Sequence, residues 1–137
     1  MKVQTRAYFA VISDELSPDE LTVCLGTQPS SAMEKASKHL DPPVPTANAW
    51  QIDSGLDRGA PLWQHLEALH ELITPVIDRI AELCKGEPSA FLRIVREFSP
   101  ADEQADLGFW LDGPWLAILG QTGAQLDVDE YDHVTAD

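Results

Sequence analysis

The sequence is poor in positive charge, in cysteine and in long apolar runs. Its 137 residues contain 9 Lys and Arg against 23 Asp and Glu, which gives a formal net charge of −14. No Lys or Arg follows Arg96, so we expect no basic patch for a nucleic acid or for an anionic membrane surface. No apolar run approaches the roughly 20 residues that a membrane-spanning helix needs. With no export signal apparent, Cys24 and Cys84 are expected to be buried reduced thiols in a cytoplasmic protein.

The common motifs for cofactors, metals and nucleophiles are also missing. The glycines match neither of the two phosphate-binding loop patterns, and Ser54 lies outside the G-x-S-x-G pattern of a nucleophile elbow. Glu67 and His70 form one E-x-x-H, but a di-iron bundle needs a second copy and two further glutamates. His65 and His70 are therefore expected on a solvated flank of a helix. The sequence predicts no cofactor and no metal.

A long amphipathic segment is the most prominent feature that is present. Between Trp50 and Lys85 we expect a short strand, a glycine turn and a helix. Apolar residues recur in the helix at steps of three and four: Leu62, Leu66, Leu69, Ile73, Val76, Ile77, Ile80, Leu83 and Cys84. Pro75 cannot donate a backbone hydrogen bond, so one bent helix of roughly 34 Å is predicted.

The remaining elements are shorter. A central strand is predicted over Thr5–Ser13, followed by a helix with Ser17 as N-cap, a capping box to Glu20 and an end at Gly26. Residues 27–49 contain four prolines and are predicted to be a mobile surface loop with at most a short edge strand near residues 28–34, and gating of a substrate is the alternative role for this loop. Further strands are predicted over Ala90–Phe98, Leu107–Leu111 and Gln125–Tyr131, with a short helix that begins at Pro114 and ends at Gly120 or Gly123.

This order of elements predicts one α+β domain over residues 1–137. Helical crossovers favour strands that run parallel, and the short link over Ser99–Asp106 favours an antiparallel pair. We therefore expect a mixed, mainly antiparallel sheet with helices packed on one face. This is a ferredoxin-like variant with an extra β-α-β tail.

Polar residues that follow two of the predicted strands form one candidate site. If those strands are parallel, both turns lie at one sheet edge, where clustered carboxylates raise a pKa for acid–base chemistry. Turn and capping chemistry accounts for the same residue types. The residues are Ser13, Asp14, Glu15, Asp53, Ser54 and Asp57.

A second candidate site lies on the last predicted strand. Asp127 and Asp129 point to one side of it, where they either hold a divalent cation weakly or form an ordinary solvent-facing edge. They belong to ten acidic residues that follow Arg96, and this charge suits either plain solubility or a basic protein partner. The ten are Glu97, Asp102, Glu103, Asp106, Asp112, Asp127, Asp129, Glu130, Asp132 and Asp137.

Four stretches carry a resemblance to a known family. They are Y-F-A-V-I-S-D-E-L-S-P-D-E-L-T-V-C-L-G at 8–26, W-Q-I-D-S-G-L at 50–56, A-P-L-W-Q-H-L-E-A-L at 60–69 and G-A-Q-L-D-V-D-E-Y at 123–131. Together they resemble the bacterial domain of unknown function 4279 family. The resemblance implies a small α+β domain, and some relatives look like immunity proteins that neutralise toxins. Residues 28–49 depart from the family pattern, because its basic turn is reduced to Lys35 and Lys38.

Two functions remain open at this point. The first is a non-enzymatic acidic binding domain of immunity type that neutralises a basic toxin. The second is a small enzyme or metal-dependent domain that uses the carboxylates at the strand ends.

Overall fold

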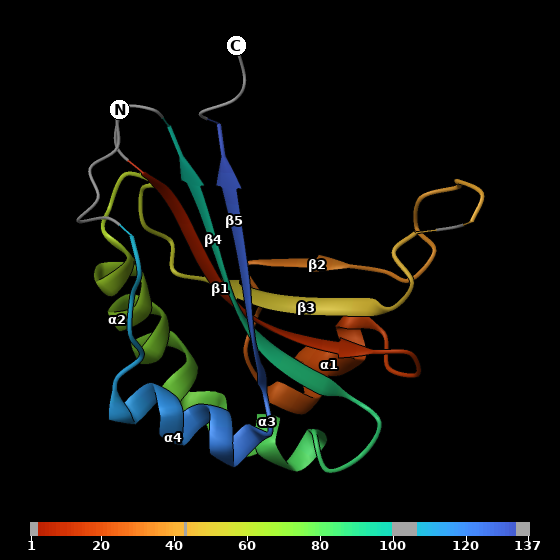
Figure 1. Cartoon of the computed structure of the whole chain (residues 1–137). Helices are drawn as coiled ribbons and strands as arrows, with labels where there is room; N and C mark the ends of the chain where they lie inside the picture. Colours follow the sequence, from red (N-terminus) through yellow and green to blue (C-terminus); the bar gives the residue numbers. More distant parts are fainter. Residues whose placement is uncertain (1–2, 43, 100–106, 134–137) are drawn as a thin grey trace.

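A five-stranded sheet with helices on one side forms the protein (Figure 1). The computed structural model describes residues 3–42, 44–99 and 107–133. In chain order the elements are β1 (Gln4–Ser13), α1 (Pro18–Leu25), β2 (Ser31–Met33), β3 (Asn48–Asp53), α2 (Leu62–Ile73), the 3-10 helix η1 (Thr74–Val76), α3 (Ile77–Leu83), β4 (Ser89–Phe98), α4 (Gly113–Thr122) and β5 (Gln125–Asp132).

The strand order confirms the predicted fold class. In the sheet the strands lie in the order β2-β3-β1-β4-β5, and each pair of neighbours among the first four is antiparallel. Phe9 of the central strand β1 pairs with Ile52 on one side and with Leu92 on the other. Each of the first two helical crossovers therefore skips one strand, which is the ferredoxin-like arrangement. The tail is β4-α4-β5, and β5 lies parallel to β4.

The predicted strand at Leu107–Leu111 is wrong. These residues are irregular and lead into the start of α4 (Figure 1). Gly108 has a positive φ of 76°, which interrupts an extended chain. Phe109 and Leu111 nevertheless pack against the core, so the alternation in this stretch comes from a packed coil. The antiparallel pair expected across Ser99–Asp106 is absent from the described strands, and residues 100–106 lie outside the described ranges.

Pro75 divides the long helix instead of bending it. Its missing N–H falls in the 3-10 turn η1, which separates α2 from α3. The apolar stripe nevertheless continues through the break, because Ile73, Val76 and Ile80 are all buried. The two helices together therefore follow the sheet as two short segments with a corner between them (Figure 1).

In the segment 27–49, the short edge strand expected near residues 28–34 is confirmed as β2, and the rest of the segment is more regular than predicted. It contains β2 and the first residues of β3, and the backbone N–H of Lys35 donates to Asn48 Oδ1 at 2.7 Å. Lys38 and Val44 form an isolated antiparallel bridge. The part between β2 and β3 stands away from the body of the molecule (Figure 1). Its mobility stays a prediction.

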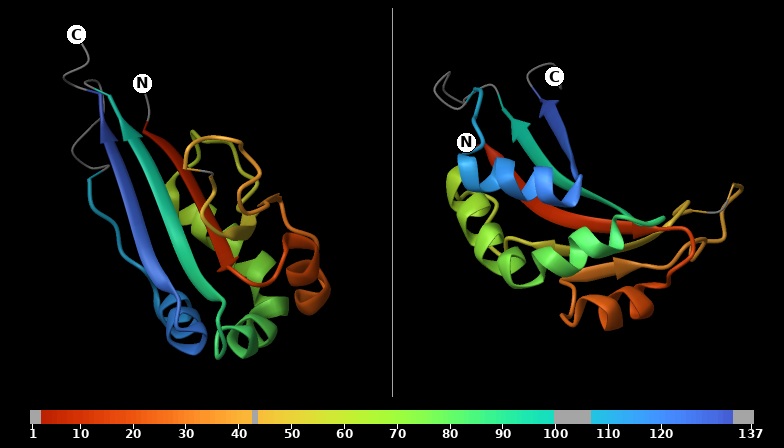
Figure 2. Two further views of the ribbon diagram at one scale, coloured as in Figure 1. Left: turned by 90° about the vertical axis from the view of Figure 1, so that its right-hand side faces the viewer. Right: turned by 90° about the horizontal axis from the view of Figure 1, so that it is seen from below.

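The core lies between the sheet and the helices, which cover one face of it (Figure 2). Trp115 of α4 stacks on Phe9 with ring centroids 6.4 Å apart, and its Nε1 donates to the carbonyl oxygen of Leu66 at 3.0 Å. The predicted cap of α1 is confirmed, since Ser17 and Glu20 form a reciprocal capping box and Gly26 ends the helix with a φ of 70°. The prediction that Cys24 is buried is wrong, because the core side of α1 is occupied by Leu21 and Leu25 and leaves Cys24 exposed.

Candidate functional site

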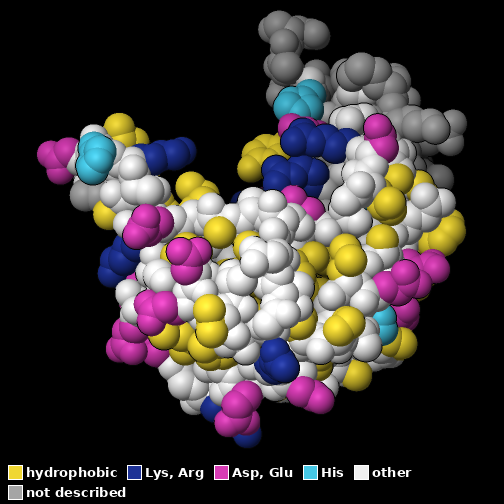
Figure 3. Space-filling view, turned by 180° about the vertical axis from the view of Figure 1, so that it is seen from behind, with side chains coloured by type: hydrophobic (Ala, Val, Ile, Leu, Met, Phe, Trp, Pro, Cys, Tyr) yellow, Lys and Arg dark blue, Asp and Glu magenta, His cyan; other side chains and the backbone are white. Residues whose placement is uncertain are grey.

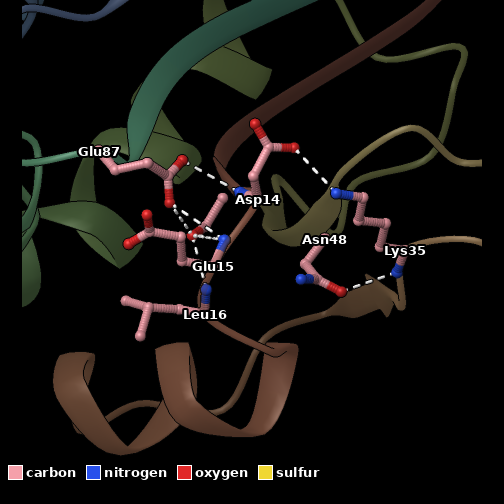
Figure 4. Close-up of polar contacts among 7 residues, drawn as sticks. Asp14, Glu15, Leu16, Lys35, Asn48 and Glu87 are labelled. Carbon is pink, nitrogen blue, oxygen red and sulfur yellow. Dashed lines mark hydrogen bonds and ion pairs between the residues drawn. The ribbon is translucent and has the colours of Figure 1, made fainter.

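The turn between β1 and α1 is the first of three polar clusters (Figure 4). Ser13 is almost fully buried, and its Oγ accepts from the backbone N–H of Leu16 at 2.8 Å. The same hydroxyl donates to Glu87 Oε1 at 2.5 Å. The second oxygen of this carboxylate accepts from the backbone N–H of Asp14 at 3.0 Å, and Oε1 also accepts from that of Glu15 at 3.2 Å. Glu87, just before β4, therefore closes the turn that starts α1.

The negative charge of the Glu87 carboxylate is stabilised more by uncharged hydrogen-bond donors than by positively charged side chains. The Ser13 hydroxyl and the Asp14 N–H lower the pKa of the Glu87 carboxyl, while nearby Lys35 adds a small effect in the same direction. Lys35 lies 3.6 Å from the carboxylate of Asp14 in an exposed ion pair (Figure 4). The side chains of Asp14 and Glu15 themselves remain exposed. This arrangement is a capped turn, which is the structural interpretation of these residues.

A buried serine–histidine pair is the second cluster. Ser54 lies directly after β3, and its Oγ is 2.6 Å from Nδ1 of His65 in the first turns of α2. Ser54 is 8% exposed and His65 is 1% exposed, so both side chains are closed off from solvent. Nε2 of His65 is buried and makes no hydrogen bond of normal geometry. Burial lowers the pKa of His65, against a smaller opposite effect from the Asp57 and Ala60 backbone oxygens and the Asp57 charge.

The expectation that His65 lies on a solvated flank is wrong. His65 lies four residues before Leu69 and eight before Ile73, and all three are buried on one side of α2. This spacing was the available signal, and it places His65 on the core side of the helix. His70 is half-buried and packs edge-on against Trp115 with ring centroids 5.7 Å apart.

The antiparallel sheet separates the two groups of residues that were predicted to share an edge. Ser13 pairs with Asn48 at one end of the β1–β3 ladder, and Tyr8 pairs with Asp53 at the other. At roughly 3.4 Å per strand residue, this places the two groups about 17 Å apart. The condition for a shared carboxylate site, parallel neighbours, is therefore not met. Asp53 Oδ1 instead accepts from Gln51 Nε2 at 3.0 Å, and Asp57 Oδ1 accepts from the Gly59 N–H at 2.7 Å.

The third cluster lies on β5. Asp127 and Asp129 project from the sheet face away from the helices, as predicted, and the guanidinium of Arg93 on β4 pairs with both. On the helix side of the same strands, Arg96 is 4% exposed and its Nη2 lies 2.7 Å from Glu130 Oε2. These pairs could not be predicted from local patterns, because they depend on the parallel register of β4 and β5. Asp102, Glu103, Asp106 and Asp137 lie outside the described residues.

The face of the sheet that carries the third cluster has no helix over it (Figure 2). Tyr8 and Phe91 meet there edge to face with ring centroids 6.4 Å apart, and the guanidinium of Arg6 lies 5.6 Å from the ring centre of Tyr8. On the described strands this face carries four carboxylates against two guanidinium groups. These are Asp53, Glu97, Asp127 and Asp129 against Arg6 and Arg93. Seen from behind, the molecule is hollowed between the projecting segment and the end of β5 (Figure 3).

Within residues 3–42, 44–99 and 107–133, no group of three or more His, Cys, Asp or Glu side chains is arranged to hold a metal ion. No helix in this part of the chain has the length and apolar character needed to cross a membrane.

Fold and sequence together define a small α+β domain of the ferredoxin-like type with a parallel β-strand added at one edge. The sequence pattern of a domain of unknown function (DUF4279) matches residues 3–133. The chain therefore belongs to the DUF4279 family, as its motifs indicated. Searches of curated proteins and of solved structures found no match.

Proposed function

We propose that this protein is a non-enzymatic binding domain, and that the uncovered sheet face takes a basic protein partner. One observation carries the proposal: a sheet face without a helical cover presents aromatic rings and an excess of carboxylates. A basic toxin that acts on a nucleic acid would be a partner of this kind. We propose further that the protein works in the cytoplasm, as an immunity protein would.

The charge arrangement supports a basic partner. Arg93 is shared by Asp127 and Asp129, so one positive group faces two negative ones. The side chain of a Lys or Arg from the partner would neutralise the remaining negative charge. An acidic surface also speeds the encounter with a basic protein, and this steering weakens as salt screens the charges.

The aromatic groups supply the second part of a binding surface. Phe91 is half-buried at the middle of the face, where it packs edge-on against the buried ring of Tyr8, and Tyr131 on β5 is half exposed. Tyrosine and phenylalanine are enriched in protein interfaces, because their rings bury much area at little entropic cost.

The alternative, a small enzyme that uses the strand-end carboxylates, receives less support. Those carboxylates lie at opposite ends of the β1–β3 ladder. Ser54 and His65 form a pair of the kind that acts as nucleophile and base, but both side chains are buried, so a substrate would have no access to the Ser54 hydroxyl. Such a pair stabilises the junction of β3 and α2 without any chemistry.

Capture and kinetics test the proposal. The purified protein is used as bait in a lysate of its own host, the partner is identified, and association is measured between about 0.1 M and 1 M salt, where the screening length falls from about 10 Å to about 3 Å. We expect a basic partner whose association rate falls strongly with salt. The double variant Asp127→Asn, Asp129→Asn should slow association more than it speeds dissociation.

The matched control removes the same charge from the helix side. Glu67→Gln with Glu71→Gln alters two exposed carboxylates of α2, away from the open face. This control should leave the association rate close to that of the unaltered protein. An acidic partner, a salt-independent rate or an equal effect of both double variants would count against the proposal.

A further inference from the structure

Among the strands that the structure describes, β5 is an edge strand of the sheet. It pairs with β4 on one side only and is the last strand in the sheet order. Eight residues long, it greatly exceeds β2, the three-residue strand at the other edge. Its outer side therefore offers a row of backbone N–H and C=O groups to another chain.

The side chains of β5 alternate between two environments. Asp127, Asp129 and Tyr131 lie on the open face, and Leu126 and Val128 lie on the helix face. Leu126 is 43% exposed although it belongs to the apolar side of the strand. Along residues 126–129, a strand laid along β5 would thus meet carboxylates at alternate positions and apolar side chains between them, whereas Glu130 and Asp132 occupy the helix face further along.

The charge of β5 decides which strand can lie there. A second copy of β5 would bring further carboxylates against Asp127 and Asp129, and like charges on neighbouring strands repel. Arg93 already lies between these two carboxylates and leaves one negative charge unbalanced. The edge therefore disfavours self-pairing and favours a strand that carries positive charge.

We propose that β5 is a strand-addition site for an extended segment of a partner with Lys or Arg at every second position and apolar residues between. This rests on the proposed function, since it names how the same basic partner is held. Backbone hydrogen bonds to β5 would supply affinity. The alternating side chains would then supply specificity, because successive residues of a strand point to opposite faces.

The test uses a synthetic ten-residue peptide of alternating lysine and valine. A peptide of the same composition, with its lysines and valines in two blocks, has equal charge but no alternation. Affinity is measured by fluorescence anisotropy, and backbone protection by hydrogen exchange in residues 125–132. We expect the alternating peptide to bind at least about tenfold more tightly than the block peptide, a difference of about 1.4 kcal/mol. It should also slow exchange in β5.

Two modifications separate strand addition from simple charge attraction. Methylating the backbone nitrogens on one edge of the peptide should abolish binding, while methylating the other edge should leave it, because only one edge faces β5. Leu126→Lys should weaken binding of the alternating peptide. Leu107→Lys, which alters a side chain 63% exposed outside the sheet, should leave it unchanged.

Several results would overturn the inference. Equal affinity of the two peptides, no binding of either, or indifference to methylation of both edges would each exclude strand addition. If the amides of β5 exchange slowly in the free protein and its mass in solution is that of a dimer, the edge strand pairs with a second copy of the chain instead. Since the partner capture is a separate measurement, a basic partner with salt-dependent kinetics would still support the proposed function when strand addition fails.

Discussion

The buried pair of Ser54 and His65 predicts a specific dependence of stability on pH. Burial lowers the pKa of His65 below its ordinary value of 6.5, so the folded protein holds this ring neutral. In the unfolded chain the ring titrates near 6.5. Below that pH the unfolded chain therefore takes up a proton that the folded protein does not, and the free energy of unfolding falls as the pH falls.

The size of this effect follows from linkage. One group of this kind changes the free energy of unfolding by at most about 1.4 kcal/mol for each pH unit between its folded and unfolded pKa values. The loss begins near pH 6.5 and stops below the folded pKa. Glu87 has a lowered pKa too, but its contribution is lost only as the pH falls below its ordinary value of 4.5. Between pH 7.5 and 5.5, the difference between the unaltered protein and a variant that lacks this ring therefore reports on His65.

The assay is urea unfolding of the unaltered protein and of His65→Gln at several pH values in this range. The unaltered protein should lose stability on acidification, and the variant should lose less, because glutamine does not titrate. Ser54→Ala should cost about 1–3 kcal/mol at pH 7.5, since it leaves Nδ1 of His65 buried without a partner. Parallel pH dependence of the unaltered protein and His65→Gln would refute the assignment of a neutral, buried ring.

Three further predictions concern the elements that hold the fold together, and chemical denaturation checks each. Ser17→Ala should lower the free energy of unfolding by about 1 kcal/mol, and Ser17→Gly by only a few tenths, because the hydroxyl that accepts from the Glu20 N–H is lost. If Ser17→Ala leaves stability unchanged but abolishes binding, this turn is part of the binding site. Leu69→Ala should lower the free energy of unfolding by about 2–5 kcal/mol, because it removes a buried side chain from the core. Glu67→Ala, on the exposed side of α2, should change it by no more than about 0.5 kcal/mol. Equal losses of stability in the two variants would mean that the buried face of α2 is misassigned. Gly26→Ala should destabilise more than Gly120→Ala, because residue 26 has a left-handed backbone, and its added Cβ would also displace the guanidinium of Arg79. At residue 120 nothing lies within 4 Å of an added Cβ, and the reverse order of the two variants would contradict this reasoning.

Local signals predicted the fold well where several of them agreed. The cap at Ser17, Pro18 in the first turn and the stop at Gly26 place α1 to within a residue. The order of helices and strands then left few possible topologies, and the ferredoxin-like one is observed. Alternation alone was less reliable, since Phe109 and Leu111 alternate in a coil that packs on the core.

The candidate site depended on information that a sequence pattern does not contain. Whether Asp14 and Asp53 share an edge depends on strand direction, and β1 and β3 are antiparallel. The partner of Asp127 and Asp129 depends on the register between β4 and β5, which brings Arg93 opposite Asp127. His65 was within reach of sequence reasoning, because its spacing to Leu69 and Ile73 follows the buried side of a helix.

The link between Glu87 and the β1–α1 turn affects the order in which the protein folds. A helix of eight residues is marginal by itself, and the turn before α1 is completed by a carboxylate 74 positions after Ser13. A motif that looks local in the sequence is therefore closed by a contact of long range, which forms only after β4 has docked. The amide hydrogens of Asp14 and Glu15, which donate to Glu87, should accordingly become protected late in folding, together with β4 and after the pairing of β1 with β3.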